Sequence, residues 1–353
     1  MRKRQLVALA ALLCATLAVT AKESAEFAAK VLATHGQNLT ADQSARLTRL
    51  LITGPALTRN IGTEDPAEQN GPHNSYHPVT RAQCVSQVLE PGLIKRNAEH
   101  ESTCGHAWMA PVPEQDGDIA SAKVCIDRFE FPNMPCEYPV VWVAASQAKR
   151  ICESMGKRLC DSHEWEGGCA GHVVEDYGFE STEMGYLRAE RRRYNGRRER
   201  VFAFDWDAEI RGQADTRKLC GVYHREDEQI AVSHDHFNFL GKSKRCHSGG
   251  SDYRSCGTNT WPAGFKHRCV SEYGVYDMHG NVAEVVNFPR TPAGKGSAGG
   301  SDKTERKGSF FVYRKNYPND CRVRQPFEHF KTAATDRHSY YQEGFRCCAD
   351  IRL

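Results

Sequence analysis

The stretch Gly274-Val-Tyr-Asp-Met-His-Gly-Asn-Val-Ala-Glu284 decides how this chain folds. It lacks both the 3.6-residue period of a helix and the strict alternation of a strand. The same absence of a regular period extends over most of the chain beyond residue 170, where glycines and aromatic residues alternate instead. This pattern predicts a loop-rich fold that depends on covalent cross-links.

Cysteines can supply those cross-links. The chain has 15 cysteines, of which 14 lie after residue 80. Cys14 lies in the apolar run Leu6 to Val19, which follows Arg2-Lys3-Arg4 and ends near the small residues Val19-Thr20-Ala21. A basic start, a short apolar core and small residues predict a signal peptide over residues 1–21. The remaining even number of cysteines predicts as many as seven disulfides in an oxidising compartment, with free or metal-bound thiols as the open alternative.

The expected location is therefore secreted or periplasmic. Leu13 stands before Cys14, where a lipoprotein signal has a small residue, so we expect no lipid anchor. No second apolar stretch approaches the roughly 20 residues that span a bilayer. The net charge of +3 is too small to indicate a nucleic-acid partner.

The chain divides into a small N-terminal part and one large domain. Residues 22–80 are expected to form a helical segment and a linker, with helices that pack on the main body or on a partner. Within it, Thr40 is placed to cap the amide of Gln43. Residues 81–353 read as one domain, in which Cys84 and Cys104 bracket a short segment that one bridge could close.

Regular elements are expected early in this domain. Val124 to Phe131 predicts a strand, and Ser146 to Met155 predicts a helix with one apolar face. A second helix is expected from His163 to Cys169, capped by Asp161 or Ser162.

Residues 172–215 look inserted, with seven arginines between Arg188 and Arg200. They indicate either a patch for an anionic partner or a solvated segment, and the interspersed Glu190 and Glu199 favour the solvated segment.

Several motifs in the same order resemble the formylglycine-generating enzyme family, also called the sulfatase-modifying factor family. Cys125-Ile-Asp-Arg-Phe-Glu-Phe-Pro-Asn133 resembles its "ID-x-[YF]-E-V-T-N" strand, and Gly156-Lys-Arg-Leu159 with Glu164-Trp-Glu166 resembles "GKRLPTEAEWE". The remaining matches are 109–113 with the opening strand, 139–143 with "PV-x-x-V-x-W", 274–284 with "G-L-Y-D-M-x-G-N-V-W-E-W", 308–310 with "GGS[FWY]" and 344–347 with the terminal "GFR". The resemblance covers residues 105–350.

The resemblance implies an α+β fold of the C-type-lectin-like type, loop-rich and stabilised by disulfides. It also implies a bridge between Cys169 and Cys347. Cys152 and Cys160 flank the Gly156 turn and could pair locally.

Oxidising members of the family bind copper(I) through two cysteines, three and eight residues after the serine of "GGS". Here Val312 and Tyr317 stand at those positions, and neither side chain can bind a soft metal. We therefore expect no copper site. The nearest thiol is Cys321, which the resemblance implies is structural. A displaced pair of Cys321 with a cysteine from another loop stays open as an alternative, although it would spoil the even disulfide count.

The resemblance also implies two candidate sites. Ser309, Arg322 and Arg346 could line a polar pocket or could pin the terminal strands by hydrogen bonds, and Tyr313 and Tyr317 lie near the former thiolate positions. Glu284, with the carbonyl groups of Gly280 and Val282, could hold a structural calcium ion in a turn fixed by Asn281. The alternative is a turn closed by hydrogen bonds alone.

Two function classes follow from these observations. The first is an exported domain that binds a protein, peptide or glycan without copper chemistry. The alternative is a divergent oxidative tailoring or maturation enzyme, an oxidoreductase related to the formylglycine-generating enzymes. The sequence leaves the ligand and the oligomeric state open.

Overall fold

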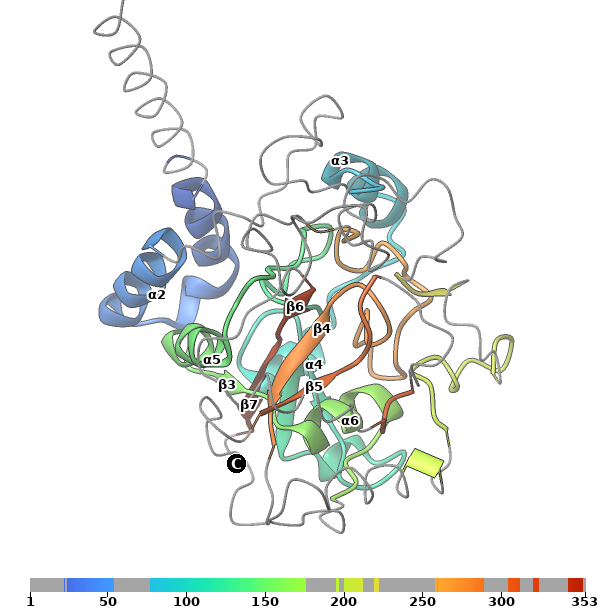
Figure 1. Ribbon diagram of the computed structural model, residues 1–353. Coiled ribbons are helices and arrows are strands. Elements are labelled where there is room, and N and C mark those ends of the chain that lie inside the picture. Colours follow the sequence, from blue (N-terminus) through green and yellow to red (C-terminus); the bar gives the residue numbers. More distant parts are fainter. Residues whose placement is uncertain are drawn as a thin grey trace, which may run out of the picture.

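Two short β-sheets form the centre of the protein, and helices lie around them (Figure 1). The computed structural model describes residues 22, 24–53, 77–175, 195–196, 200–211, 219–221, 258, 260–288, 304–311, 320–323 and 342–351. Within these residues, no helix is long and apolar enough to cross a membrane. Most of the expected linker and much of the arginine-rich segment lie outside the described residues.

The first sheet has the strand order β1-β2-β7-β3 and is antiparallel throughout. Its strands are β1 (Met109–Val112), β2 (Val124–Asp127), β3 (Arg158–Leu159) and β7 (Cys347–Asp350). The predicted strand from Val124 to Phe131 ends earlier, at Asp127. There the chain turns, because the side chain of Asn133 accepts a hydrogen bond from the amide of Phe129.

The second sheet has the order β5-β4-β6. Strand β4 (Ala283–Asn287) pairs antiparallel with β5 (Thr304–Lys307) and parallel with β6 (Glu343–Gly344). Every residue of these three strands is buried, including the charged ones. The polar side chains of this sheet must therefore find partners inside the protein.

The helices of the main domain follow the predicted pattern. Helix α5 (Ala145–Ser154) occupies the expected position. Helix α6 (Ser162–Ala170) is capped by Asp161, whose carboxylate accepts from the amides of His163 and Glu164. Shorter helical segments complete the described part: α3 (Arg81–Cys84), the π-helical turn η3 (Val85–Leu89), α4 (Ala98–Cys104), and the 3-10 turns η1 (Gly36–Asn38) and η4 (Ile119–Ser121).

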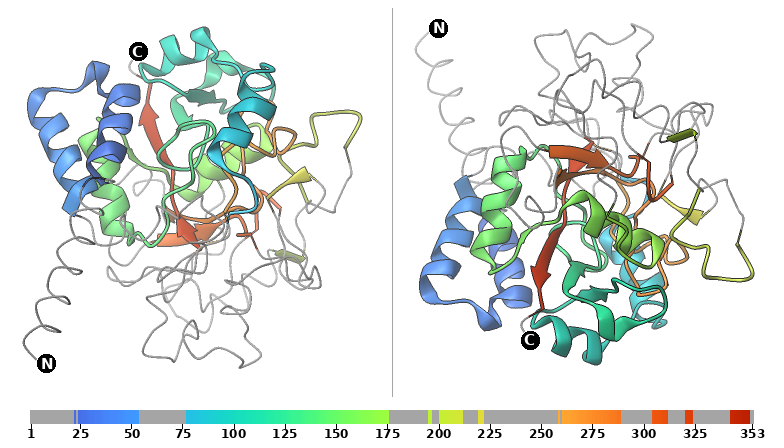
Figure 2. Two further views of the ribbon diagram at one scale, coloured as in Figure 1. Left: turned by 90° about the horizontal axis from the view of Figure 1, so that it is seen from above. Right: turned by 90° about the horizontal axis from the view of Figure 1, so that it is seen from below.

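The N-terminal helices pack on the main body. A helix over 24–35 and α2 (Ala41–Thr53) lie beside α5 in all three views (Figures 1 and 2). Buried side chains of both helices, among them Val31 and Leu47, share a core with Ile151 of α5. Thr40 caps the amide of Gln43 at 3.2 Å, as predicted. The hydrophobic effect thus joins this segment to the domain.

Six disulfides cross-link the described residues. They are Cys84–Cys136, Cys104–Cys125, Cys152–Cys347, Cys160–Cys348, Cys169–Cys321 and Cys220–Cys269. Cysteines 246 and 256 lie outside the described residues.

All three expected pairings are wrong. Cys84 pairs with Cys136 and Cys104 with Cys125, so no bridge joins Cys84 to Cys104. Cys169 pairs with Cys321 rather than with Cys347, and Cys152 and Cys160 do not pair with each other.

The first sheet explains why Cys152 and Cys160 do not pair with each other. Strand β7 carries the adjacent residues Cys347 and Cys348, which point to opposite faces because side chains alternate along a strand. One face meets Cys152 of α5 and the other meets Cys160 beside β3. Cys152 and Cys160 are therefore both drawn to β7.

These two bridges close nearly the same long loop, since Cys347 and Cys348 are adjacent and Cys152 and Cys160 lie only eight residues apart. We expect either pair to be removable at a modest cost when both its cysteines are changed to Ala. Removing both pairs should cost roughly 3 kcal/mol more than the sum of the single removals, because each single removal opens only a short loop and the double removal also opens the long one in the unfolded chain. Denaturant unfolding of the three variants measures this. Strict additivity would contradict the pairing, and non-reducing peptide mapping is the control.

Candidate functional site

The stretch 274–284 forms a turn centred on Asn281. This residue has a φ of +53°, in the left-handed region that Asn tolerates. Its amide donates to the carbonyl of Gly221, its side-chain oxygen accepts from the amide of Trp261, and its side-chain nitrogen donates to Glu130 at 2.6 Å. Asn281 therefore fixes the turn, as predicted.

Arg346, of the terminal motif, is completely buried. Its guanidinium donates two hydrogen bonds of 2.6 Å, one to each oxygen of Glu284. It also donates to the carbonyl groups of Asp127 and Tyr276, each at 3.0 Å. Trp165 of α6 donates a further bond to Glu284. Arg346 thus pins the terminal strand inside the protein and does not line a pocket.

Two more carboxylates lie in the interior close to this ion pair. Burial raises the pKa of Glu130 well above its ordinary value, and the carboxylates of Asp277 and Glu284 raise it further. Burial also raises the pKa of Asp277 to about 7, although the amide of Gly264, at 2.6 Å, and the charge of Arg346 act against this shift. Near neutral pH this cluster therefore holds protons that the unfolded chain would release.

This proton uptake makes stability depend on pH. Between the unfolded pKa of Asp277, near 4, and its folded value of about 7, the folded state binds more protons, so the free energy of unfolding falls as pH rises. Asp277→Asn keeps an oxygen for the amide of Gly264 and cannot ionise. We expect it to leave stability at pH 4 almost unchanged and to raise it by roughly 2–4 kcal/mol at pH 8 relative to the wild type.

Denaturant unfolding of both proteins across this pH range measures the difference. Asp116→Asn, at an exposed carboxylate, is the control and should follow the wild-type curve. If the free energy of unfolding of Asp277→Asn changes with pH just as that of the wild type does, Asp277 is already ionised in the folded protein at pH 4 to 8 and the prediction is wrong.

The predicted calcium ligands only partly fit an ion. Gly280 and Val282 belong to the turn, but both oxygens of Glu284 already accept from Arg346. A calcium ion at this carboxylate would lie against a buried positive charge. The amide of Val282 donates to Glu130, so hydrogen bonds already close the turn. The calcium ion stays a prediction, and this geometry favours the alternative.

Removing calcium tests the two alternatives directly. For a turn closed by hydrogen bonds, we expect the Tm in EGTA and in millimolar calcium to agree. Magnesium at the same concentration is the control for ionic strength. A rise in Tm with calcium that magnesium does not reproduce would establish the ion, because ligands that bind only the folded state stabilise it.

Ser309 and Arg322 belong to two separate described stretches, 304–311 and 320–323, and the first of these contacts the same turn. Ser309 follows β5, and the amide of Phe311 donates to the carbonyl of Asn281 at 3.0 Å. Within the described residues, Oγ of Ser309 and Nε of Arg322 are buried without a hydrogen-bond partner. A terminal nitrogen of Arg322 lies 3.5 Å from Nε2 of His172. Two of the predicted pocket residues thus offer unused polar atoms, whereas Tyr313 and Tyr317 lie outside the described residues.

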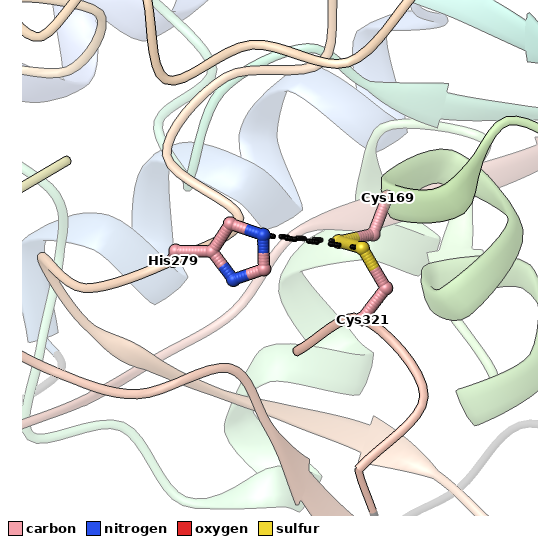
Figure 3. A group of neighbouring side chains, drawn as sticks. All are labelled: Cys169, His279 and Cys321. Atoms are coloured by element: carbon pink, nitrogen blue, oxygen red, sulfur yellow. Dashed lines mark hydrogen bonds between the residues drawn. A yellow bond between two sulfur atoms is a disulfide. The ribbon is translucent and has the colours of Figure 1, made fainter. Parts of the chain in front are cut away.

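Cys169, His279 and Cys321 form a cluster of sulfur and imidazole (Figure 3). The disulfide of Cys169 and Cys321 faces the ring of His279, with Nε2 at 3.7 Å and 3.9 Å from the two sulfurs. All three side chains are buried. The resemblance implied that Cys321 is structural, and its disulfide confirms this. No pattern in the sequence placed the imidazole of His279 beside these sulfurs.

Lys307 is another residue that motif reading missed. It stands directly before Gly308-Ser309, where the family motif "GGS" has its first glycine. Its fully buried ammonium donates to Glu166 of α6 and to the carbonyl of Val323, at 2.9 Å for the latter. This charge pair joins β5 to α6. The sequence did offer one sign of this role, since a lysine replaces the first glycine of the motif.

A cavity of about 640 Å³ lies elsewhere, between the segment 92–100 and the chain near Tyr273. Its lining includes Lys95, Arg96 and Arg128 but not Ser309. Arg128 is already engaged, because it donates to the carbonyl groups of Gly274 and Lys95 at 2.8 Å each. No motif pointed to this cavity, and the segment 92–100 lies before the residues that carry the resemblance.

The two small sheets, the flanking helices and the long connecting segments define a C-type-lectin-like fold that carries a sulfatase-modifying-factor domain. The model of the sulfatase-modifying factor enzyme 1-like domain matches residues 5–351, so the chain belongs to this family. No curated protein matches the chain.

Proposed function

We propose that this protein is an exported member of the family that binds a protein, peptide or glycan and performs no copper chemistry. The observation that carries the proposal is the replacement of the two metal-binding cysteines by Val312 and Tyr317. Copper(I) is held by soft thiolate ligands, which neither side chain offers.

The remaining thiols near this position do not compensate. Cys321, the nearest one, is bonded to Cys169 and has no thiolate to give. All twelve cysteines of the described residues are in disulfides. Oxidation of a substrate thiol through copper thus lacks its metal ligands in this state of the chain.

Buried polar atoms of Ser309 and Arg322 support a binding role. A buried hydroxyl and a buried guanidinium nitrogen without partners cost free energy unless a ligand or a water satisfies them. Arg322 carries a positive charge, and Ser309 can donate or accept. These groups suit a ligand that presents a carboxylate, a sulfate or a backbone carbonyl.

Export is supported by the chemistry of the cross-links. Disulfides persist in oxidising compartments and are rare where thiols are kept reduced. The six bridges of the described residues fit the basic and apolar N-terminal segment, which predicts secretion into such a compartment.

Binding is tested with a glycan array and a peptide array, each probed with the labelled full chain. We expect specific binding to one of them. Ser309→Ala and Arg322→Ala should each weaken it by about tenfold, since a hydrogen bond to a charged group contributes about 1.5–3 kcal/mol. Ser86→Ala is the matched control, because this serine is exposed and bonds only to the nearby carbonyl of Gln83. Binding that neither variant changes would contradict the proposed site.

Copper chemistry is tested on the chain with its disulfides intact. We expect no stoichiometric copper(I) binding against a competing chromophoric chelator and no aldehyde from a peptide thiol. Tight binding of one ion, or aldehyde formation lost in Ser309→Ala, would overturn the proposal in favour of a divergent oxidative tailoring enzyme.

A further inference from the structure

We infer that Cys169, Cys321 and His279 form a redox-gated zinc site, closed as a disulfide in this structure and able to bind Zn²⁺ when the disulfide is reduced. The three ligand atoms lie within 4.8 Å of one another. Among the described residues, these three are the one group of Cys, His, Asp or Glu side chains whose ligand atoms lie close enough together to share a metal ion.

The distances suit a tetrahedral ion once the two sulfurs separate and Nε2 of His279 releases the amide of Ala203. Zinc bonds of about 2.3 Å to sulfur and 2.1 Å to nitrogen place sulfur and nitrogen about 3.6 Å apart and the two sulfurs about 3.8 Å apart. Nε2 of His279 already lies 3.7 Å from one sulfur and 3.9 Å from the other. The two sulfurs are bonded to each other here and separate when the bond is reduced.

The imidazole is held in the tautomer that a metal needs. The amide of Ala203 donates to Nε2 of His279 at 2.9 Å, so this nitrogen carries its lone pair and the proton is on Nδ1. The bound ion would replace the amide of Ala203 at Nε2. Phe202 and Phe204 flank the ring at 5.5 Å and 5.8 Å between centroids and keep its position.

The three ligands come from separate parts of the fold. Figure 3 shows Cys169 on α6, Cys321 on the segment near the C-terminus and His279 on the central turn. A Cys₂His set leaves one position of a tetrahedral zinc ion for water or a ligand. Cys321 is next to Arg322, and the amide of Phe311 donates to the carbonyl of Asn281 in the turn that carries His279, so two of the three ligands lie close, in the chain or through this hydrogen bond, to the residues of the proposed binding role.

The reaction balances with a dithiol as reductant. Two electrons pass from the dithiol to the Cys169–Cys321 bond, which breaks into two thiols, while the dithiol becomes a cyclic disulfide. Zn²⁺ then displaces the two thiol protons and binds two thiolates and the neutral imidazole. Oxidation reverses the sequence and releases the ion.

The test uses the full chain, treated with an immobilised dithiol that is removed before metal is added. Alkylation and peptide mapping establish which bridge is reduced, and circular dichroism establishes that the chain stays folded. We expect one equivalent of Zn²⁺ to bind to the chain reduced at Cys169–Cys321 and none to the oxidised chain. Co²⁺ should give the thiolate charge-transfer and visible bands of a tetrahedral site.

Three variants separate this site from adventitious binding. His279→Ala should weaken Zn²⁺ binding at least about tenfold, because one of the three protein ligands is lost. The double change Cys169→Ser with Cys321→Ser should abolish the Co²⁺ bands. The matched control, Cys104→Ser with Cys125→Ser, should retain them. Equal uptake in wild type and either site variant would overturn the inference.

Two further results would also overturn it: no ion bound to a folded chain reduced at this bridge, or a bridge that is reduced only when the chain unfolds. The proposed binding function rests on Ser309 and Arg322 and on the absence of cysteines at positions 312 and 317. It is tested on the chain with its disulfides intact. It would stand if the zinc site failed.

Discussion

The structure depends on the buried ion pair between Arg346 and Glu284. One guanidinium joins the segment before β7 to β4 through the carboxylate, to β2 through the carbonyl of Asp127 and to the central turn through the carbonyl of Tyr276. Removing one partner of such a pair leaves an uncompensated buried charge, which is strongly destabilising. The C-terminal strand, the central turn and both sheets therefore form one unit.

Covalent bonds reinforce the same region. Adjacent cysteines of β7 bridge to α5 and to the residue after β3, so the last strand is fixed on both of its faces. Cys321 is bonded to α6 in turn. The regular elements are short, with strands of two to five residues. Such elements bury little surface by themselves, so charge pairs and disulfides supply the order that long strands would otherwise provide.

Much of the fold was predictable from local patterns and from motif order. The helix at 145–154, the cap at Asp161, the role of Asn281 and the family were all read from the sequence, because each rests on neighbours along the chain or on a quoted motif. Strand β2 was predicted too long, since its end depends on Asn133 turning the chain. The site was less predictable, because Lys307, His279 and the polar atoms around Ser309 acquire their roles only through residues far away in the sequence.

The sequence by itself determined the chemistry present: cysteines in an even number after residue 80, a family scaffold, and valine and tyrosine where copper-binding members have thiols. Only the tertiary structure decided which cysteines meet, because a disulfide requires two sulfurs brought together in space and its partners here are 21 to 195 residues apart. The same reason applies to Arg346, which could have lined a pocket until the fold enclosed it with Glu284. Burial and partner choice are properties of packing, and a list of residue types does not contain them.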